Sequence, residues 1–304
     1  MRMSNAMPST IETTRRTFLR SITGSLVLAP LALQAYGRER RASFLVVSDT
    51  HLGRNDDSAA AEQWKRTAAE MAKAAGKLIL HLGDIVDGGR EPQYAIYKQI
   101  RDTINKPVHE IPGNHDPREL FEKHIRKPID TAVDHDWLRI LLVGNARVDS
   151  HDGFLSAEQL KWIDEQCAET TAQGRYILIC MHVPAHANAH PDRGWYVKPA
   201  EGQNTLYEIV TRHQRHILAL FHGHFHNGIR GWDDHAPVHE ILFPSALYNQ
   251  DRQLEKQQAP GYNLPEFRPG FTQVTIEEGR MSLRYQVTGG SDVVEKSLDQ
   301  KQLQ

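Results

Sequence analysis

Short apolar runs, each followed directly by turn residues or polar side chains, limit the fold of this chain more than any other feature. The runs cover residues 44–47, 78–80, 138–143, 176–180, 217–221 and 238–243. Their length and their content of valine, isoleucine and leucine are typical of buried strands. Helical patterns over residues 59–75 and 92–105, and a capping box at residues 156–159, fall between them. Strands that alternate with helices predict an α/β fold.

The C-terminal part of the chain has a different pattern. Residues 271–276 and 281–287 flank a glycine-containing turn, which predicts an antiparallel hairpin and therefore a mixed sheet. Residues 244–269 form a long polar stretch with several prolines, which is typical of a functional loop. We see no internal repeat and no second domain boundary. We therefore expect one domain over residues 42–288 and a frayed C-terminal tail over residues 289–304.

The composition excludes several classes of protein. The chain has 304 residues, of which 39% are hydrophobic and 24% are charged, with a formal net charge of −2. This near-neutral balance provides no basic surface for a nucleic acid polymer, so we expect none as a partner. The two cysteines, Cys167 and Cys180, are too few for a disulfide framework or a thiolate metal site.

The first 36 residues differ from the rest of the chain. Arg15 and Arg16 precede an apolar run over residues 25–35, which is too short to span a bilayer comfortably and contains Pro30. Paired arginines before a short apolar run predict a twin-arginine signal peptide over residues 1–36. We therefore expect the Tat translocase as a partner during export, a periplasmic or secreted protein, and no stable membrane association after signal removal. The alternative is a disordered basic tail before an amphipathic helix.

Four of these apolar runs, and the further short stretch over residues 107–112, are each followed by a carboxylate, an amide or an imidazole. The motifs are Ser48-Asp49-Thr50-His51, His81-Leu82-Gly83-Asp84-Ile85-Val86-Asp87, Gly113-Asn114-His115-Asp116, Met181-His182 and His222-Gly223-His224-Phe225-His226. In open α/β sheets, sites lie outside the carboxyl ends of the strands, so these five ends should converge. A buried polar turn explains one such end, but it does not explain five in one chain.

The residue types of the five motifs indicate a metal site. Asp, His and Asn side chains without a thiolate suit Fe, Mn, Zn or Ni, and the large share of imidazole argues against calcium. His224 and His226 are two residues apart, so on an extended segment they point to opposite sides. One imidazole is then available for each of two neighbouring ions. A carboxylate with two oxygens can bridge such a pair.

In this order, Asp-x-His, Gly-Asp-x-x-Asp, Gly-Asn-His-Asp, a single His and Gly-His-x-His resemble the motifs of the calcineurin-like metallophosphoesterase family. The resemblance spans Ser48 to His226. It implies a four-layer α/β/β/α sandwich with two mixed β-sheets. It also implies a ligand set for two divalent or trivalent metal ions: Asp49, His51 and His226 on one ion, Asn114, His182 and His224 on the other, and Asp84 bridging both.

The resemblance implies a binuclear metal-dependent hydrolase that cleaves phosphate esters. The substrate is a phosphomonoester or a phosphodiester, cyclic nucleotides included, attacked by a metal-activated hydroxide. Binding to the metal lowers the pKa of water from 15.7 towards roughly 7, which makes hydroxide available at neutral pH. Purple acid phosphatases usually lack a histidine in the first motif, so His51 disfavours that branch. The alternative is a metal-poor phosphoesterase-fold scaffold that binds protein partners; such relatives lose ligands, whereas this chain has all of them.

Two residues of the Gly-Asn-His-Asp loop are predicted to act in catalysis. His115 is left to face the substrate, where it protonates the departing oxygen or stabilises charge on the transferring phosphoryl group. Asp116 orients either His115 or the backbone. Asp87 is expected to hydrogen-bond to the loop rather than to bind metal.

The remaining histidines have weaker predictions. We expect His81 and His222, which lie within strands, to be structural. His186 and His190 follow His182 on a loop and either line the substrate pocket or are solvated. No motif assigns a role to His109, His124, His135, His151, His213, His216, His235 or His239.

Overall fold

The computed structural model describes residues 40–54, 57–186, 188–190, 195–231, 238–249, 268–277, 279–291 and 293–300. The predicted signal peptide over residues 1–36 lies outside these ranges, as does most of the predicted loop over residues 244–269. Among the helices within these ranges, none is long and apolar enough to cross a membrane.

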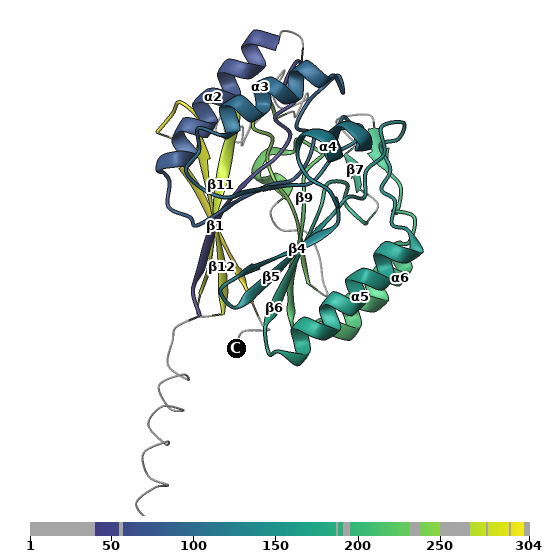
Figure 1. Ribbon diagram of the computed structural model, residues 1–304. Coiled ribbons are helices and arrows are strands. Elements are labelled where there is room, and N and C mark those ends of the chain that lie inside the picture. The colour runs from purple at the N-terminus through teal and green to yellow at the C-terminus, as the bar shows by residue number, and fades with distance from the viewer. Residues whose placement is uncertain are drawn as a thin grey trace, which may run out of the picture. The chain divides into compact units, whose positions relative to one another are not determined.

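Two β-sheets form the centre of the fold (Figure 1). The first has the order β13-β12-β11-β1-β2-β3. It contains β1 (Ala42–Val47), β2 (Ile79–His81), β3 (Val108–Glu110), β11 (Gly270–Glu277), β12 (Arg280–Val287) and β13 (Val293–Asp299). Strands β1, β2 and β3 are parallel, whereas β11, β12 and β13 continue the sheet in antiparallel pairs. The predicted hairpin is the β11–β12 pair, and this sheet is mixed.

The second sheet has the order β10-β9-β6-β5-β4. It contains β4 (Thr131–His135), β5 (Leu138–Val143), β6 (Tyr176–Met181), β9 (Ile217–His222) and β10 (His239–Leu242). Its strands are parallel except for β4, which pairs with β5 in the antiparallel sense. This sheet is therefore mixed as well.

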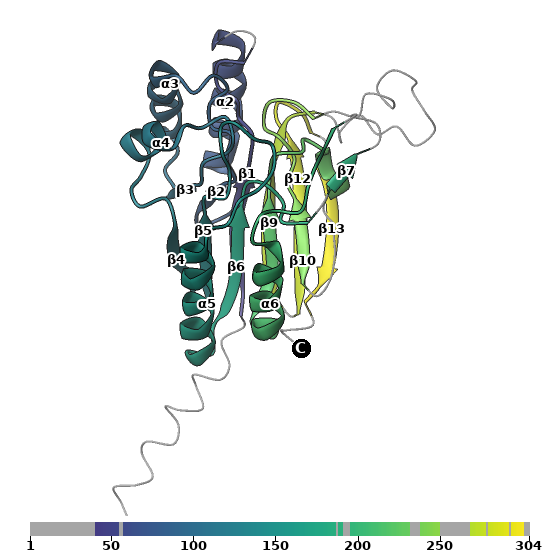
Figure 2. The same ribbon diagram turned by 90° about the vertical axis from the view of Figure 1, so that its right-hand side faces the viewer.

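Helices cover the outer face of each sheet (Figures 1 and 2). Helices α2 (Asp57–Lys73) and α3 (Glu91–Arg101) pack on the first sheet, and α5 (Ala157–Ala172) and α6 (Gln203–His213) pack on the second. In β1, Phe44 and Val46 face the core between the sheets while Leu45 and Val47 face the helices. Burial on both faces explains why the strands are continuous apolar runs. The predicted four-layer α/β/β/α sandwich is confirmed.

The other elements are short. They are α4 (Arg118–His124), the two-stranded sheet of β7 (Asn188–His190) and β8 (Trp195–Val197), and the 3-10 helix η2 (Gly228–Gly231). Helix α5 begins at the predicted capping box: the Gln159 amide donates to Ser156 Oγ at 3.2 Å, and the Ser156 amide donates to Gln159 Oε1 at 3.0 Å.

The prediction of a frayed tail after Gly289 is wrong, because β13 pairs with β12 along seven residues. Of the residues of β13, only Leu298 is buried. The strand therefore lacks the apolar run that revealed the other strands. Main-chain pairing at the sheet edge holds it in place.

Candidate metal centre

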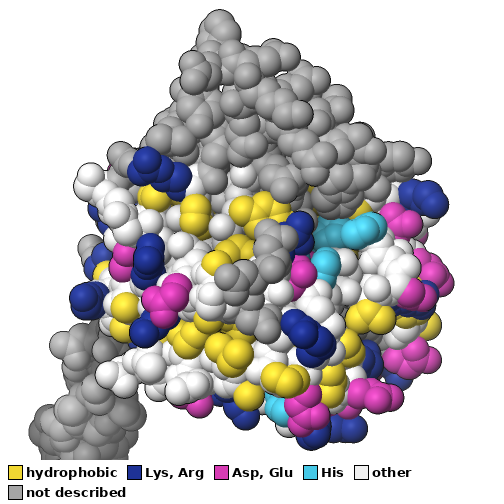
Figure 3. All heavy atoms as spheres, turned by 90° about the horizontal axis from the view of Figure 1, so that it is seen from above, with side chains coloured by type: hydrophobic (Ala, Val, Ile, Leu, Met, Phe, Trp, Pro, Cys, Tyr) yellow, Lys and Arg dark blue, Asp and Glu magenta, His cyan; other side chains and the backbone are white. Residues whose placement is uncertain are grey.

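The five predicted motifs follow β1, β2, β3, β6 and β9, and their carboxyl ends lie at one edge of the two sheets. The loops at this edge contact one another across the sheets: the His224 amide donates to Asp49 Oδ1 at 3.1 Å, and Ser245 Oγ donates to the Asp49 carbonyl at 2.9 Å. In the space-filling view of this face, histidine side chains reach the surface beside charged side chains (Figure 3).

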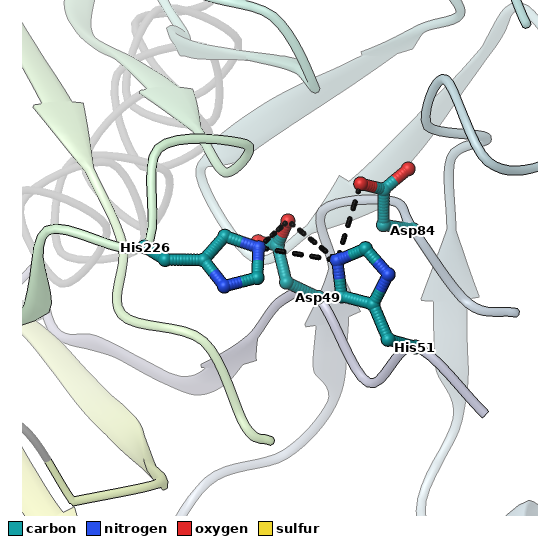
Figure 4. A group of neighbouring side chains, drawn as sticks. All are labelled: Asp49, His51, Asp84 and His226. Carbon is teal, nitrogen blue, oxygen red and sulfur yellow. Dashed lines mark hydrogen bonds and ion pairs between the residues drawn. The ribbon is translucent and has the colours of Figure 1, made fainter. Parts of the chain in front are cut away.

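One group of ligands, the first cluster, consists of Asp49, His51, Asp84 and His226, whose donor atoms lie within 4.8 Å of one another (Figure 4). His226 Nε2 lies 3.1 Å from Asp49 Oδ1 and 3.1 Å from His51 Nε2. His51 Nε2 lies 3.4 Å from Asp84 Oδ2. All four side chains are buried.

The other ring nitrogens of the first cluster show which atoms face the site. His51 Nδ1 donates to Asp87 Oδ1 at 2.9 Å, and His226 Nδ1 donates to the Tyr248 carbonyl at 2.9 Å. In the neutral rings, both Nε2 atoms are then unprotonated, and their lone pairs face each other at 3.1 Å. This arrangement is repulsive unless a proton or a metal ion lies between the lone pairs. With the carboxylates of Asp49 and Asp84 in the same group, the first cluster fits a metal ion.

A second cluster consists of Asp84, His182 and His224. His182 Nδ1 donates to the Leu82 carbonyl at 2.6 Å, which leaves Nε2 to face His224 Nδ1 at 3.2 Å and Asp84 Oδ2 at 3.3 Å. Burial lowers the pKa of His182, but Asp84 and Asp49 outweigh burial and raise the pKa to about 9. The position therefore favours positive charge.

Asp84 is common to both clusters, but only one of its oxygens faces them. Oδ2 approaches both His51 and His182, whereas Oδ1 accepts a hydrogen bond from the His115 amide at 2.9 Å. The sequence suggested a bridge through two oxygens; the structure presents a single oxygen to both clusters.

The Gly-Asn-His-Asp loop lies against Asp84. A side chain at Gly113 would overlap the carboxylate and the amide of Asp84, so only glycine permits this approach. Asn114 is buried, and among the described residues its Oδ1 has no hydrogen-bond partner. A buried amide oxygen without a donor is costly in a protein interior, and a metal ion would satisfy it.

His115 and Asp116 have different surroundings. His115 Nδ1 donates to the Asp87 carbonyl at 2.7 Å, and the side chain is 30% exposed. Asp116 is buried and accepts hydrogen bonds from the amides of Gly113 and Ile85 and from the Tyr94 hydroxyl, at 2.9 Å, 3.0 Å and 3.0 Å. Of the two alternatives for Asp116, the structure therefore supports orientation of the backbone.

The backbone is strained at this edge of the sheets. The non-glycine residues with positive φ among the described residues are Asp49, His51, Asp84, His224, His226 and Asp136, and only Asp136 lies away from the site. Such residues cluster at functional sites because surrounding contacts must hold them in place. His224 and His226 do face different clusters, as predicted, but through left-handed backbone rather than through an extended strand.

The other predicted residues have structural partners. Asp87 Oδ1 accepts from His51 and from Arg54 Nη1, the latter at 3.1 Å, and so orients a ligand residue. Burial lowers the pKa of His81 to about 3, and its Nε2 lies 3.1 Å from Thr50 Oγ1. His222 Nε2 and His186 Nδ1 each lie 3.0 Å from Glu240 Oε1. The side chain of His190 lies outside the described part of the chain.

Sequence reasoning missed three neighbours of the site. The ring of Tyr248 lies 4.3 Å from that of His226, with the Arg54 guanidinium 4.5 Å above the Tyr248 ring. The ring of His151 lies 5.8 Å from that of His224. None of these three residues directly follows an apolar run, and although Tyr248 lies in the predicted functional loop over residues 244–269, no motif singles it out.

The fold and the clustered ligands together define a metal-binding hydrolase. The chain belongs to the calcineurin-like phosphoesterase family, because the model of that family matches residues 42–228, which is more than half of the chain. The family match together with the phosphodiesterase relatives described below assigns this protein to the phosphoric ester hydrolases.

Among curated proteins, the chain is 29% identical over 191 residues to a probable cyclic nucleotide phosphodiesterase of Fibrobacter succinogenes, covering 60% of this chain and 71% of the relative. It is 26% identical over 157 residues to a glycerophosphodiester phosphodiesterase of Enterobacter lignolyticus. That match covers 48% of this chain and spans only about half, 54%, of the relative.

Among solved structures, a dimetal phosphatase from Danio rerio has a TM-score of 0.64 at 14% identity. The superposition covers 86% of this chain and 99% of the phosphatase. At this identity the likeness shows a shared fold.

Proposed function

We propose that the protein is a binuclear metal-dependent hydrolase of phosphate esters, with phosphodiesters as its preferred substrates. The observation that carries the proposal is that Asp84 Oδ2 lies between two sets of buried imidazole nitrogens, 3.4 Å from His51 Nε2 and 3.3 Å from His182 Nε2.

Each cluster would hold one ion. Asp49, His51, Asp84 and His226 would bind the first, and Asp84, Asn114, His182 and His224 would bind the second. Imidazole, carboxylate and amide donors without thiolate suit Fe, Mn, Zn or Ni. When bound, the ions supply Lewis acidity towards the phosphate oxygens and an activated water.

His115 would face the substrate beside the first cluster. Its ring lies 4.7 Å from that of His51, and its Nδ1 donates to the Asp87 carbonyl at 2.7 Å. Nε2 is then the atom available to the substrate. A ring protonated at Nε2 donates that proton to the departing oxygen.

Phosphodiesters are favoured because both relatives described above are named as phosphodiesterases, one for cyclic nucleotides and one for glycerophosphodiesters. The alternative is that the protein hydrolyses phosphomonoesters by the same mechanism.

The test is metal analysis with a substrate panel. The protein is stripped with a chelator, reloaded separately with Mn, Fe, Ni or Zn, and assayed on phosphomonoesters and phosphodiesters. We expect two ions per chain and faster hydrolysis of diesters. Protein that binds no ion and cleaves no ester would contradict the proposal and favour a scaffold that binds protein partners.

We also propose export through the Tat translocase, so that the mature enzyme is periplasmic or secreted. The support is the Arg15-Arg16 pair ahead of the apolar run over residues 25–35. Replacing both arginines by lysine should abolish export while activity in lysate persists. Normal amounts of the double variant in the periplasm would contradict this prediction.

A further inference from the structure

The loop over residues 144–155, which follows β5, is anchored beside the second cluster. The Asn145 side chain pairs with the main chain of Val183 in both directions: Nδ2 donates to the Val183 carbonyl at 2.7 Å, and Oδ1 accepts from the Val183 amide at 3.1 Å. Val183 directly follows the ligand residue His182. The base of the loop is therefore tied to the second cluster.

The far end of the loop is also fixed. Asp152 Oδ1 accepts from the Lys198 amide at 2.9 Å. The Glu201 amide donates to the Gly153 carbonyl at 3.0 Å, and the Leu155 amide donates to the Glu201 carbonyl at 2.9 Å. Both ends of the loop are therefore held by hydrogen bonds, which limits the positions that the residues between them can take.

The loop places His151 at the second cluster. The side chain is exposed, and its ring centroid lies 5.8 Å from that of His224. His115, which is also accessible, lies 4.7 Å from His51 of the first cluster. Each cluster thus has an accessible histidine beside it that is not part of its ligand set.

The same loop lines a cavity of about 640 Å³. Pro112 and Asp116, which precede and follow the Gly113–His115 segment, line it too, so the cavity lies between the loop over residues 144–155 and the loop that carries Asn114 and His115. Its apolar lining includes Val148 and Phe154, and the Arg147 guanidinium lies 3.6 Å from the centre of the Phe154 ring. An aromatic and aliphatic lining suits an organic group.

The charges around the cavity disfavour a second phosphate group. Four carboxylate residues line it against two arginines: Asp116, Asp130, Asp149 and Glu158 against Arg118 and Arg147. A further anionic group would meet net negative charge there. A neutral group, such as an alcohol joined to phosphorus through an ester, would not.

We propose that this loop is the subsite for the ester group that stays on phosphorus, with His151 contacting that group and the cavity receiving its organic part. The inference rests on the proposed function and narrows it to phosphodiesters. In the reaction, the oxygen of water forms a bond to phosphorus and gives up a proton. The bond between phosphorus and the leaving oxygen breaks, and the leaving oxygen keeps the electron pair and takes up a proton. The product monoester keeps the second ester group, which the loop holds throughout. A phosphomonoester has no group for this subsite.

The test compares bis(p-nitrophenyl) phosphate with p-nitrophenyl phosphate. Both release the same leaving group; where the diester keeps a p-nitrophenyl ester on phosphorus, the monoester has an ionisable oxygen. In His151→Ala, kcat/KM for the diester should fall about 10-fold to 100-fold. The value for the monoester should change by less than about threefold, and metal content should stay the same. His151→Asn, which keeps a hydrogen-bond donor, should restore part of the loss.

Two further variants sharpen the test. Phe154→Ala should raise KM for the diester with little effect on kcat, because it removes a wall of the cavity. His213→Ala is the matched control: this histidine is partly buried on α6, pairs with Asp164 at 2.9 Å, and should leave both rates unchanged.

Equal losses on the two esters in His151→Ala, or no loss on either, would overturn the inference while the proposed function stands. Wild-type protein that cleaves neither ester with any of the four metals would overturn the proposed function itself, and the inference with it.

Discussion

The two clusters share Asp84 but differ in charge and in the groups that hold them. The first contains two carboxylates, Asp49 and Asp84, and its His51 is held by the side chain of Asp87, which is 24% exposed. The second contains Asp84 as its one carboxylate, and its His182 is held by the main-chain carbonyl of Leu82. The first cluster therefore attracts a cation more strongly through its negative charge. In the second cluster, the main-chain carbonyl fixes the orientation of the His182 ring more rigidly than an exposed side chain would.

The largest effect is expected at Asp84, the residue common to both clusters. In Asp84→Asn, one oxygen that faces both clusters loses its negative charge, so metal should be lost from both. Activity should fall well beyond the roughly 10–100-fold that is typical of groups outside the ligand set. Metal per chain after gel filtration is the measurement. Retention of both ions would contradict the shared role of Oδ2.

Replacing His115 should change the rate of the reaction without changing the metal content of either cluster. Its ring lies beside the first cluster, and its Nδ1 is held by the Asp87 carbonyl. His115→Ala should keep both ions and lower the rate about 10²–10⁴-fold for alkyl leaving groups. The loss should be much smaller for p-nitrophenyl esters, whose leaving group needs no proton at neutral pH. Loss of metal from the variant would instead indicate that His115 is a metal ligand.

Asp87→Asn should affect the first cluster alone. The amide can still accept from His51 Nδ1, but without charge, so we expect a loss of about 10–100-fold in activity or in affinity for the first ion. Stepwise removal of metal by a chelator measures the two affinities. A loss equal to that of Asp84→Asn would place Asp87 among the direct ligands.

The smallest effect is expected from Asn114→Asp, which adds a carboxylate to the second cluster. In the wild type, the second ion should leave first during chelation, because its cluster has less negative charge. The substitution should raise the affinity for that ion by about tenfold and bring the two steps closer together. Simultaneous release of both ions from the wild type would contradict the prediction that the difference in charge sets the order of release.

Local patterns were sufficient to predict much of the fold. Residues 138–143 form β5 with the predicted bounds, and Ser156 caps α5 as predicted. Strand β5 is buried on both faces and α5 begins with a capping box, so neighbouring residues in the sequence are enough to predict each of them. Strand β13 was missed because an exposed edge strand depends on main-chain pairing with β12, which leaves little trace in the side chains.

The order and chemistry of the five motifs were determined by the sequence alone, because residue type decides which ligands a strand end can offer. The tertiary structure decided how those ligands are presented. The Asp49 carboxylate accepts from the amide of His224, 175 positions away in the chain, and the partners of Nδ1 in His51, His182 and His226 decide which nitrogen faces each cluster. It also brought His151 to within 5.8 Å of His224. Such details depend on contacts between distant segments, and no local pattern contains them.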